Sequence, residues 1–175
     1  LKHLSDPSLY KGDYYVEALK KSFPSYFYRI LSNIIKVDQI PATYFLLYLI
    51  SRYFLFFWIY KLWHQISKNH FASICAVLTF ILVVRVDEFL YRTFSHQEFV
   101  LPFILAGFYY FFKDRFFLAS FLFGLGANIH GIYSLFPMLF MLTYLLLDIK
   151  KWKFSTFIKS GIIFTLSALP FIIFI

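Results

Sequence analysis

Residues 41–63 read PATYFLLYLISRYFLFFWIYKLW, an apolar and aromatic stretch whose only charged residues are Arg52 and Lys61. A helix rises about 1.5 Å per residue, so a stretch of this length crosses a hydrocarbon core of about 30 Å. The rest of the chain has the same character. Of its 175 residues, 61% are hydrophobic and 15% are charged, where soluble domains average about 25% charged. We therefore predict an all-α protein, a polytopic transmembrane helical bundle.

Several apolar runs follow residues 43–63, which form the clearest predicted span. Runs 71–84 and 99–112 are short for a crossing, whereas run 116–147 is too long for one straight helix. The polar residues 128–131 divide this long run into two short, paired helices. In the last run, 154–175, Pro170 predicts a kink because proline cannot donate the helical hydrogen bond. We expect about six spans within residues 41–175, with Ser120 and Gly124 forming a small-residue packing face between them.

Residues 1–40 are the sizeable region that is not membrane-like. Asp6 is placed to stabilise a turn with Ser8, and Asp13 is placed to cap a helix over residues 14–22. A second helix, over residues 26–37, would separate two sets of side chains. The apolar set is Phe27, Ile30, Leu31, Ile34 and Ile35, and the polar set is Arg29, Ser32, Asn33 and Lys36. Both helices are too short and too polar to span, so we predict interfacial helices in an outer loop.

Basic residues are divided unequally between the loops on the two sides of the predicted bundle. One side has two acids, Asp114 and Asp148, and eight basic residues: Lys61, Lys68, Lys113, Arg115, Lys150, Lys151, Lys153 and Lys159. The short loops opposite have Arg85 and Arg92. Positive loops face the cytoplasm, so residues 1–40, 85–98 and 128–131 are expected outside. The net charge of +8 is thereby explained by topology, and nucleic acid is not an expected partner.

The side of the bundle that is predicted to face outward contains seven of the nine acids, together with His96 and His130. The seven are Asp6, Asp13, Glu17, Asp38, Asp87, Glu88 and Glu98. Acids gathered opposite the positive loops predict an active or binding face. Asp13, with Asp6 seven residues before it, could take a proton from a substrate hydroxyl or hold a divalent cation. Alternatively, Asp13 is only a helix cap.

The second outer loop combines acids, an imidazole and guanidinium groups: Arg85, Asp87, Glu88, Arg92, His96 and Glu98. This mixture suits a site for phosphate and Mg²⁺ or Mn²⁺, with arginines on the phosphate oxygens. A solvated loop paired with its own charges is the alternative. The acids Asp13, Asp87 and Glu88 are the candidate metal ligands, and no zinc spacing is present.

Two polar features lie inside the apolar region. His130 and Asn128 occupy a helix break, where exposed backbone needs a protein-lined or wet cavity. Two interpretations stay open: these side chains bind substrate, or they only stabilise the break. Arg52 lies near the middle of the clearest span and is expected to pair with a buried carboxylate or a lipid phosphate, or to extend to the interface. The tyrosines and tryptophans are interpreted mostly as an interfacial belt.

Residues 6–14 read DPSLYKGDY and precede the interfacial helices, and the acidic loop and the helix break at 128–131 follow. This order resembles the amino-terminal half of GT-C-type membrane glycosyltransferases and related bacterial multi-span proteins. The resemblance implies catalysis outside a bacterial or archaeal plasma membrane, with a sugar on a polyprenyl phosphate as donor. It also implies that Asp13 or Asp6 is the first-loop catalytic acid and that Asp87 or Glu88 is the second. The paired acids with one intervening residue, familiar in that superfamily, are absent from the first loop.

We accordingly predict that Asp13 and Asp87 or Glu88 converge with His130 on one outer cavity. Two other classes stay open: a transporter or flippase for a lipid-linked or anionic solute, and a non-catalytic scaffold of a membrane complex. The chain starts without methionine and ends in an apolar run, so we expect a piece of a longer protein. Its single cysteine, Cys75, allows no intrachain disulfide.

Overall fold

The structure is a computed structural model that describes residues 1–6, 8–22, 26–83 and 95–174, and these residues form helices and connecting turns without a strand. The first part holds α1 (Lys2–Ser5), α2 (Tyr14–Ser22), α3 (Phe27–Ile34) and the short 3-10 helix η1 (Val37–Gln39). The bundle holds α4 (Ile40–Ser67), α5 (His70–Val83), α7 (His96–Phe99), α8 (Leu101–Phe111), α9 (Phe116–Ala127), α10 (Gly131–Leu147), α11 (Ile149–Trp152), α12 (Phe154–Ser167) and α13 (Leu169–Phe174). The all-α prediction is therefore confirmed for the part of the chain that is described.

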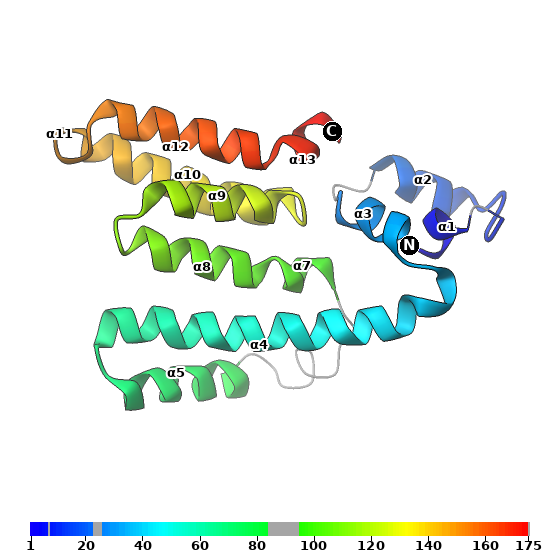
Figure 1. Cartoon of the computed structure of the whole chain (residues 1–175), viewed down its shortest axis with the longest axis horizontal. Coiled ribbons are helices and arrows are strands. Elements are labelled where there is room, and N and C mark those ends of the chain that lie inside the picture. Colours follow the sequence, from blue (N-terminus) through cyan, green and yellow to red (C-terminus); the bar gives the residue numbers. More distant parts are fainter. Residues whose placement is uncertain (7, 23–25, 84–94, 175) are drawn as a thin grey trace.

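The long helices lie alongside one another in a bundle, in which α9 packs against α8, α10 and α12, and α4 packs against α5 and α8 (Figure 1). Among the described residues, one helix is long and apolar enough to cross a membrane, namely η1 continued by α4 over Val37–Ser67. Helices α5, α9, α10 and α12 are apolar but shorter. The expected break at 128–131 is present, since α9 ends at Ala127 and α10 begins at Gly131.

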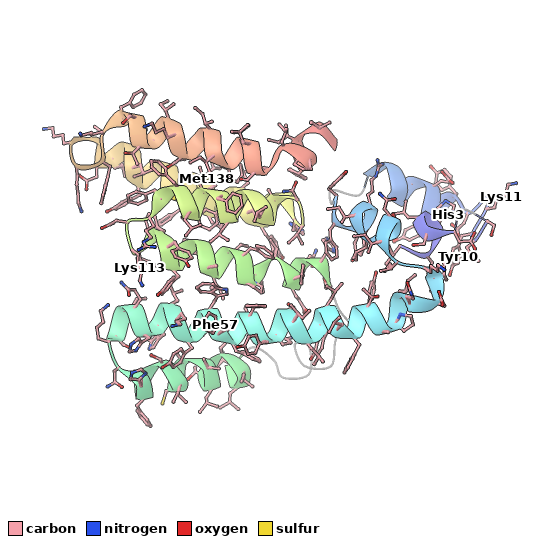
Figure 2. All side chains as sticks on the ribbon, in the orientation of Figure 1. His3, Tyr10, Lys11, Phe57, Lys113 and Met138 are labelled. Atoms are coloured by element: carbon pink, nitrogen blue, oxygen red, sulfur yellow. The ribbon has the colours of Figure 1, made fainter. Side chains whose placement is uncertain are left out.

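The buried core lies between α8, α9 and α10. It consists of Phe111, Phe116, Ala119, Phe123, Met138, Met141 and Leu145, and Met138 is labelled in Figure 2. Glycine allows the helices to approach closely here. A Cβ added to Gly107 would fall 2.3 Å from the Phe123 ring, and one added to Gly124 would fall 1.8 Å from Ser167 Oγ on α12. The predicted packing face of Ser120 and Gly124 is therefore confirmed as the contact surface of α9.

The two ends of the bundle differ in their connections. At one end are the turns between α4 and α5, between α8 and α9, and from α10 through α11 to α12 (Figure 1). These are the three turns with the excess of lysine. At the opposite end are α1–α3, the break at 128–130 and α13 (Figure 1). The sorting of basic turns to one end, which the sequence predicts, is therefore present in the fold.

Helix α3 differs from its prediction in extent and in the use of its apolar side chains. It ends at Ile34, because Lys36 is extended (φ −82°, ψ 162°) ahead of η1. Phe27 and Leu31 are buried, while Ile30 is 42% and Ile34 is 70% exposed. Phe27 and Leu31 form one ridge of the helix, and Ile30 and Ile34 form the neighbouring ridge. Only the ridge of Phe27 and Leu31 faces the bundle. The apolar stripe is thus divided between a packed half and an exposed half.

Candidate functional site at the junction of α3, α4 and α7

One apolar cluster joins the first part of the chain to the bundle. Phe27 and Leu31 of α3 are buried together with Val100 and with Ile129 in the break between α9 and α10. Side chains of α4, including Tyr44 and Tyr48, pack against the same cluster. This packing brings α3, α4, α7 and the break at 128–130 to one place, although the four segments are far apart in the sequence.

The polar groups beside this cluster form what we call the tyrosine–histidine junction: Tyr28, Tyr44, His96 and His130. The hydroxyl of Tyr28 lies 3.3 Å from Nδ1 of His96, and the hydroxyls of Tyr28 and Tyr44 share a hydrogen bond. The rings of His96 and His130 stack at 5.4 Å between centroids, with 16° between their planes. His96 is 9% exposed and His130 is 7% exposed.

The hydrogen bonds of the junction determine where the imidazole protons lie. His130 is the N-cap of α10, and its Nδ1 accepts from the backbone N–H of Tyr133 at 3.3 Å. A neutral ring whose Nδ1 is an acceptor carries its proton on Nε2. His130 is therefore an N–H donor at Nε2. His96 contributes a second hydrogen bond to the junction through its Nδ1, which lies 3.3 Å from the Tyr28 hydroxyl.

Both histidines are also uncharged near neutral pH. Burial, and to a smaller extent the neighbouring His130, lowers the pKa of His96 to about 4. Burial likewise lowers the pKa of His130. Two stacked imidazolium rings would repel each other, so neutrality is also what permits the close contact. The junction thus presents a neutral imidazole N–H at Nε2 of His130.

Beside the junction, Arg52 and Glu98 form an ion pair. Nη2 of Arg52 lies 2.6 Å from Oε2 of Glu98, and Arg52 is 6% exposed. The guanidinium also lies 4.9 Å from the centre of the Tyr48 ring, a cation–π distance. The predicted pairing of Arg52 with a carboxylate is confirmed, and the carboxylate is that of the partly buried Glu98. Glu98 was expected to bind substrate, and the structure places its carboxylate on this arginine.

Asn128 connects two broken helices. Its side-chain amide donates to the carbonyl oxygens of Gly124 at 3.1 Å and Ser167 at 2.8 Å, and its Oδ1 accepts from the N–H of Phe171 at 3.0 Å. All of these partners are backbone groups. The geometry therefore gives Asn128 a structural role at the break, and its expected contact with substrate stays a prediction.

The first-loop acids are bound to their own backbone. Asp6 accepts from the N–H of Ser8 at 3.0 Å and from its hydroxyl at 2.7 Å, and these bonds lower the pKa of Asp6. Asp13 accepts from the N–H groups of Tyr15 at 2.9 Å and Val16 at 3.2 Å, so it caps α2 as predicted. Figure 1 shows α1 and α2 beyond α3, on the side away from the bundle. The convergence of Asp13 with His130 stays a prediction.

Four of the predicted site residues, Arg85, Asp87, Glu88 and Arg92, lie outside the described residues. Within the residues that are described, no group of three or more His, Cys, Asp or Glu side chains could hold a metal ion. The hydrogen bonding of His130 also makes it unsuited to binding a metal ion. If a metal took its Nε2 lone pair, the proton would have to move to Nδ1, where the Tyr133 N–H already donates.

The tyrosines of the junction are the functional candidates that the sequence analysis missed, because it assigned most tyrosines to an interfacial belt. One signal was present: Tyr44, Tyr48 and Arg52 are spaced by four, so they lie on one face of α4. Nothing comparable pointed to Tyr28, whose partner His96 is 68 residues away. A comparison of the chain with protein-family models, with curated proteins and with solved structures found no match.

Proposed function

We propose that this chain belongs to a multi-pass membrane protein that binds a polyprenyl-phosphate-linked sugar on the outer face, as a glycosyltransferase of the GT-C type does. The supporting observation is the buried His130 of the tyrosine–histidine junction, whose Nδ1 accepts from the Tyr133 N–H, so that its Nε2 carries the proton as a neutral donor. It lies at the end of the bundle opposite the basic turns (Figure 1). A phosphate oxygen is a ligand that accepts from such a donor without requiring an imidazolium.

Membrane embedding is supported by the outward faces of the bundle helices. Phe71 and Leu82 of α5 are 76% and 73% exposed, and Phe136 of α10 is 66% exposed. Monomeric soluble proteins rarely expose contiguous apolar patches larger than a few hundred Å². In a bilayer these faces would contact lipid, and the shorter helices would be accommodated by local thinning. The exposed Ile30 and Ile34 of α3 would then lie at the outer interface.

The proposed chemistry is transfer of the sugar from phosphate to an acceptor hydroxyl. The acceptor oxygen attacks the anomeric carbon, the bond from that carbon to the phosphate oxygen breaks, and polyprenyl phosphate leaves with the electron pair. Donation from His130 would favour the departing anion electrostatically. The base that takes the acceptor proton is proposed among Asp13, Asp87 and Glu88, as the resemblance implies. Glu98 would contribute indirectly, by fixing the position of the Arg52 guanidinium.

Binding of farnesyl phosphate to the full chain in detergent tests the role of His130. The His130→Asn variant retains a side chain that caps α10 well but lacks the Nε2–H. We expect its affinity to fall by about 10-fold or more, the range for a hydrogen bond to a charged group. His64→Asn, at the basic end, is the matched control and should bind normally. Equal affinity of His130→Asn and wild type, or equal binding of farnesol and farnesyl phosphate, would overturn the proposal.

A transporter for an anionic solute is the second candidate, and Arg52 is the observation that favours it. A buried arginine partway along the longest helix is typical of a solute or ion pathway. Transport would require Arg52 to exchange Glu98 for the solute during each cycle. The two proposals are distinguished by measuring the uptake of a radiolabelled anion that carries no lipid into vesicles containing the full chain. A transporter would accumulate this anion inside the vesicles, whereas a transferase would not.

A further inference from the structure

The end of the bundle away from the junction carries an unusual amount of positive charge. We call the eight residues there the basic end: Lys61, Lys68, Lys113, Arg115, Lys150, Lys151, Lys153 and Lys159. All except Lys61 are exposed, and the acids of the same turns are Asp114 and Asp148. Eight positive minus two negative charges leave +6, out of +8 for the whole chain. The charge comes from three separate turns that the fold gathers (Figure 1).

The backbone of these turns adds an independent observation. Each of the three turns contains one non-glycine residue with positive φ: Lys68 at 53°, Asp114 at 56° and Lys153 at 60°. Glycine occupies this region without the steric cost that a side chain incurs. Two of the three positions nevertheless carry lysine. A lysine at a backbone conformation that favours glycine indicates that its side chain has a function at this position.

Aromatic rings lie within cation–π distance of several of the ammonium groups. Nζ of Lys113 lies 4.5 Å from the centre of the Tyr109 ring, and Nζ of Lys151 lies 4.5 Å from that of Trp152. Figure 2 labels Lys113 at this end and Phe57 further along α4, where the Phe57 ring lies 5.5 Å from Nζ of Lys61. Tryptophan and tyrosine rings favour the headgroup level of a bilayer. Lysines on such rings are positioned where lipid phosphates would be.

We propose that the basic end binds the headgroups of anionic phospholipids and enriches them around the bundle. The inference rests on the membrane-embedding part of the proposed function and is independent of the transferase part. Anionic headgroups have a net negative charge that the lysines can neutralise. In a zwitterionic headgroup, the negative charge of the phosphate is already balanced by a positive group of the same headgroup. Lysine is suited to this contact because it binds phosphate as a mobile point charge and needs no fixed geometry.

Tryptophan fluorescence can report on these lipids selectively. The three tryptophans of the chain are Trp58, Trp63 and Trp152, on α11 and on the half of α4 nearer the basic end. The full chain is reconstituted in vesicles of phosphatidylcholine with a minor fraction of phosphatidylglycerol. Acyl-chain bromine, which quenches tryptophan on contact, is placed either on phosphatidylglycerol or on an equal fraction of phosphatidylcholine. We expect at least about twofold more quenching from the anionic lipid, decreasing with salt.

A matched pair of variants assigns the effect to the basic end. Lys68→Gly/Lys150→Gln/Lys153→Gly removes three charges and places glycine at two positions with positive φ, so this variant should be at least as stable as wild type. Its preference for the anionic lipid should fall well below that of wild type, because three of the eight positive charges of the basic end are removed. Lys2→Gln/Lys11→Gln/Lys36→Gln removes three exposed charges at the opposite end and should keep the preference. Circular dichroism and thermal unfolding verify that both variants are folded.

The outcomes separate this proposal from the one on which it rests. Equal quenching by the two brominated lipids would overturn anionic-lipid binding while leaving membrane embedding supported. A preference that stays at the wild-type level in the Lys68/Lys150/Lys153 variant, or is lost in the Lys2/Lys11/Lys36 variant, would overturn its assignment to the basic end. Absence of quenching by either lipid would overturn membrane embedding itself.

Discussion

Asn128 donates a hydrogen bond of 2.8 Å from its side-chain amide to the carbonyl oxygen of Ser167, at the residue where α12 ends. In an unbroken helix this carbonyl would accept from the N–H of Phe171, four residues on. That N–H donates to Oδ1 of Asn128 instead, at 3.0 Å. One amide thus takes the place of a helical bond, and the break between α9 and α10 is joined to the break between α12 and α13.

We expect Asn128→Asp to lower the free energy of unfolding by about 2–4 kcal/mol, because a carboxylate oxygen would face the carbonyls of Gly124 and Ser167 in place of their donor. Asn33→Asp, at an exposed position of α3, is the control and should change stability little. The free energies of unfolding are measured in mixed micelles in which the fraction of a denaturing detergent is increased stepwise. A loss below about 0.5 kcal/mol would contradict the bridging role of Asn128.

The pair of Arg52 and Glu98 gives a second prediction. Arg52→Met alone should destabilise the chain by about 3 kcal/mol, because it leaves the half-buried Glu98 carboxylate without its partner. Replacing both residues by methionine should recover most of that loss, since the desolvation of two charges is also removed. A double-mutant cycle on unfolding measures the coupling. Additive losses would show that the 2.6 Å contact does not contribute to stability.

Stability should depend on the protonation of His96. The folded-state pKa of about 4 is below the ordinary histidine value of 6.5, so the unfolded chain binds the extra proton first as pH falls. The stability contributed by neutral His96 is therefore complete above pH 6.5 and is lost between pH 6.5 and about pH 4. We expect a loss of about 1–2 kcal/mol over this range that is missing in His96→Asn. Parallel pH profiles of the two proteins would refute the assignment.

Two glycines of the bundle should respond oppositely to alanine. Gly124→Ala would place Cβ 1.8 Å from Ser167 Oγ and 2.7 Å from the carbonyl oxygen of Phe164, and we expect a loss of about 1–3 kcal/mol. An added Cβ at Gly161 meets nothing within 4 Å, so Gly161→Ala should be neutral or stabilising within α12. Thermal unfolding of the two variants in one detergent compares them directly. Equal effects would show that the contact of α9 with α12 is looser than described.

The proposed orientation predicts which residues are accessible from outside intact cells. In a Cys75→Ala background, Ser8→Cys should react with an impermeant thiol reagent, because residues 1–40 are expected outside. Ser155→Cys, exposed at the start of α12 beside the basic end, should react only after the cells are opened. The reverse pattern would invert the topology and place the tyrosine–histidine junction inside.

Several local features of the fold could be predicted from the residues alone. The division of run 116–147 at residues 128–131, the cap on α2 by Asp13 and the interruption of the last helix near Pro170 are all present. Each is signalled by groups within about four residues of one another, through capping side chains and proline geometry. The bonds of Asn128 to Ser167 and Phe171 then join the two breaks over a long sequence separation. The extent of α3 was predicted less well, because its last residues are shaped by the entry into η1.

The pairings of the candidate site were decided only by the tertiary structure. The sequence indicates that Arg52 needs a carboxylate, but the choice of Glu98, 46 residues away, follows from the packing of α4 against α7. The contact of Tyr28 with His96 and the bridge from Asn128 to Phe171 are of the same kind. Apolar patterning specifies which segments are buried, whereas many packings of those segments satisfy it equally well. The close fit of glycine, tyrosine and histidine side chains between particular helices then selects one of them.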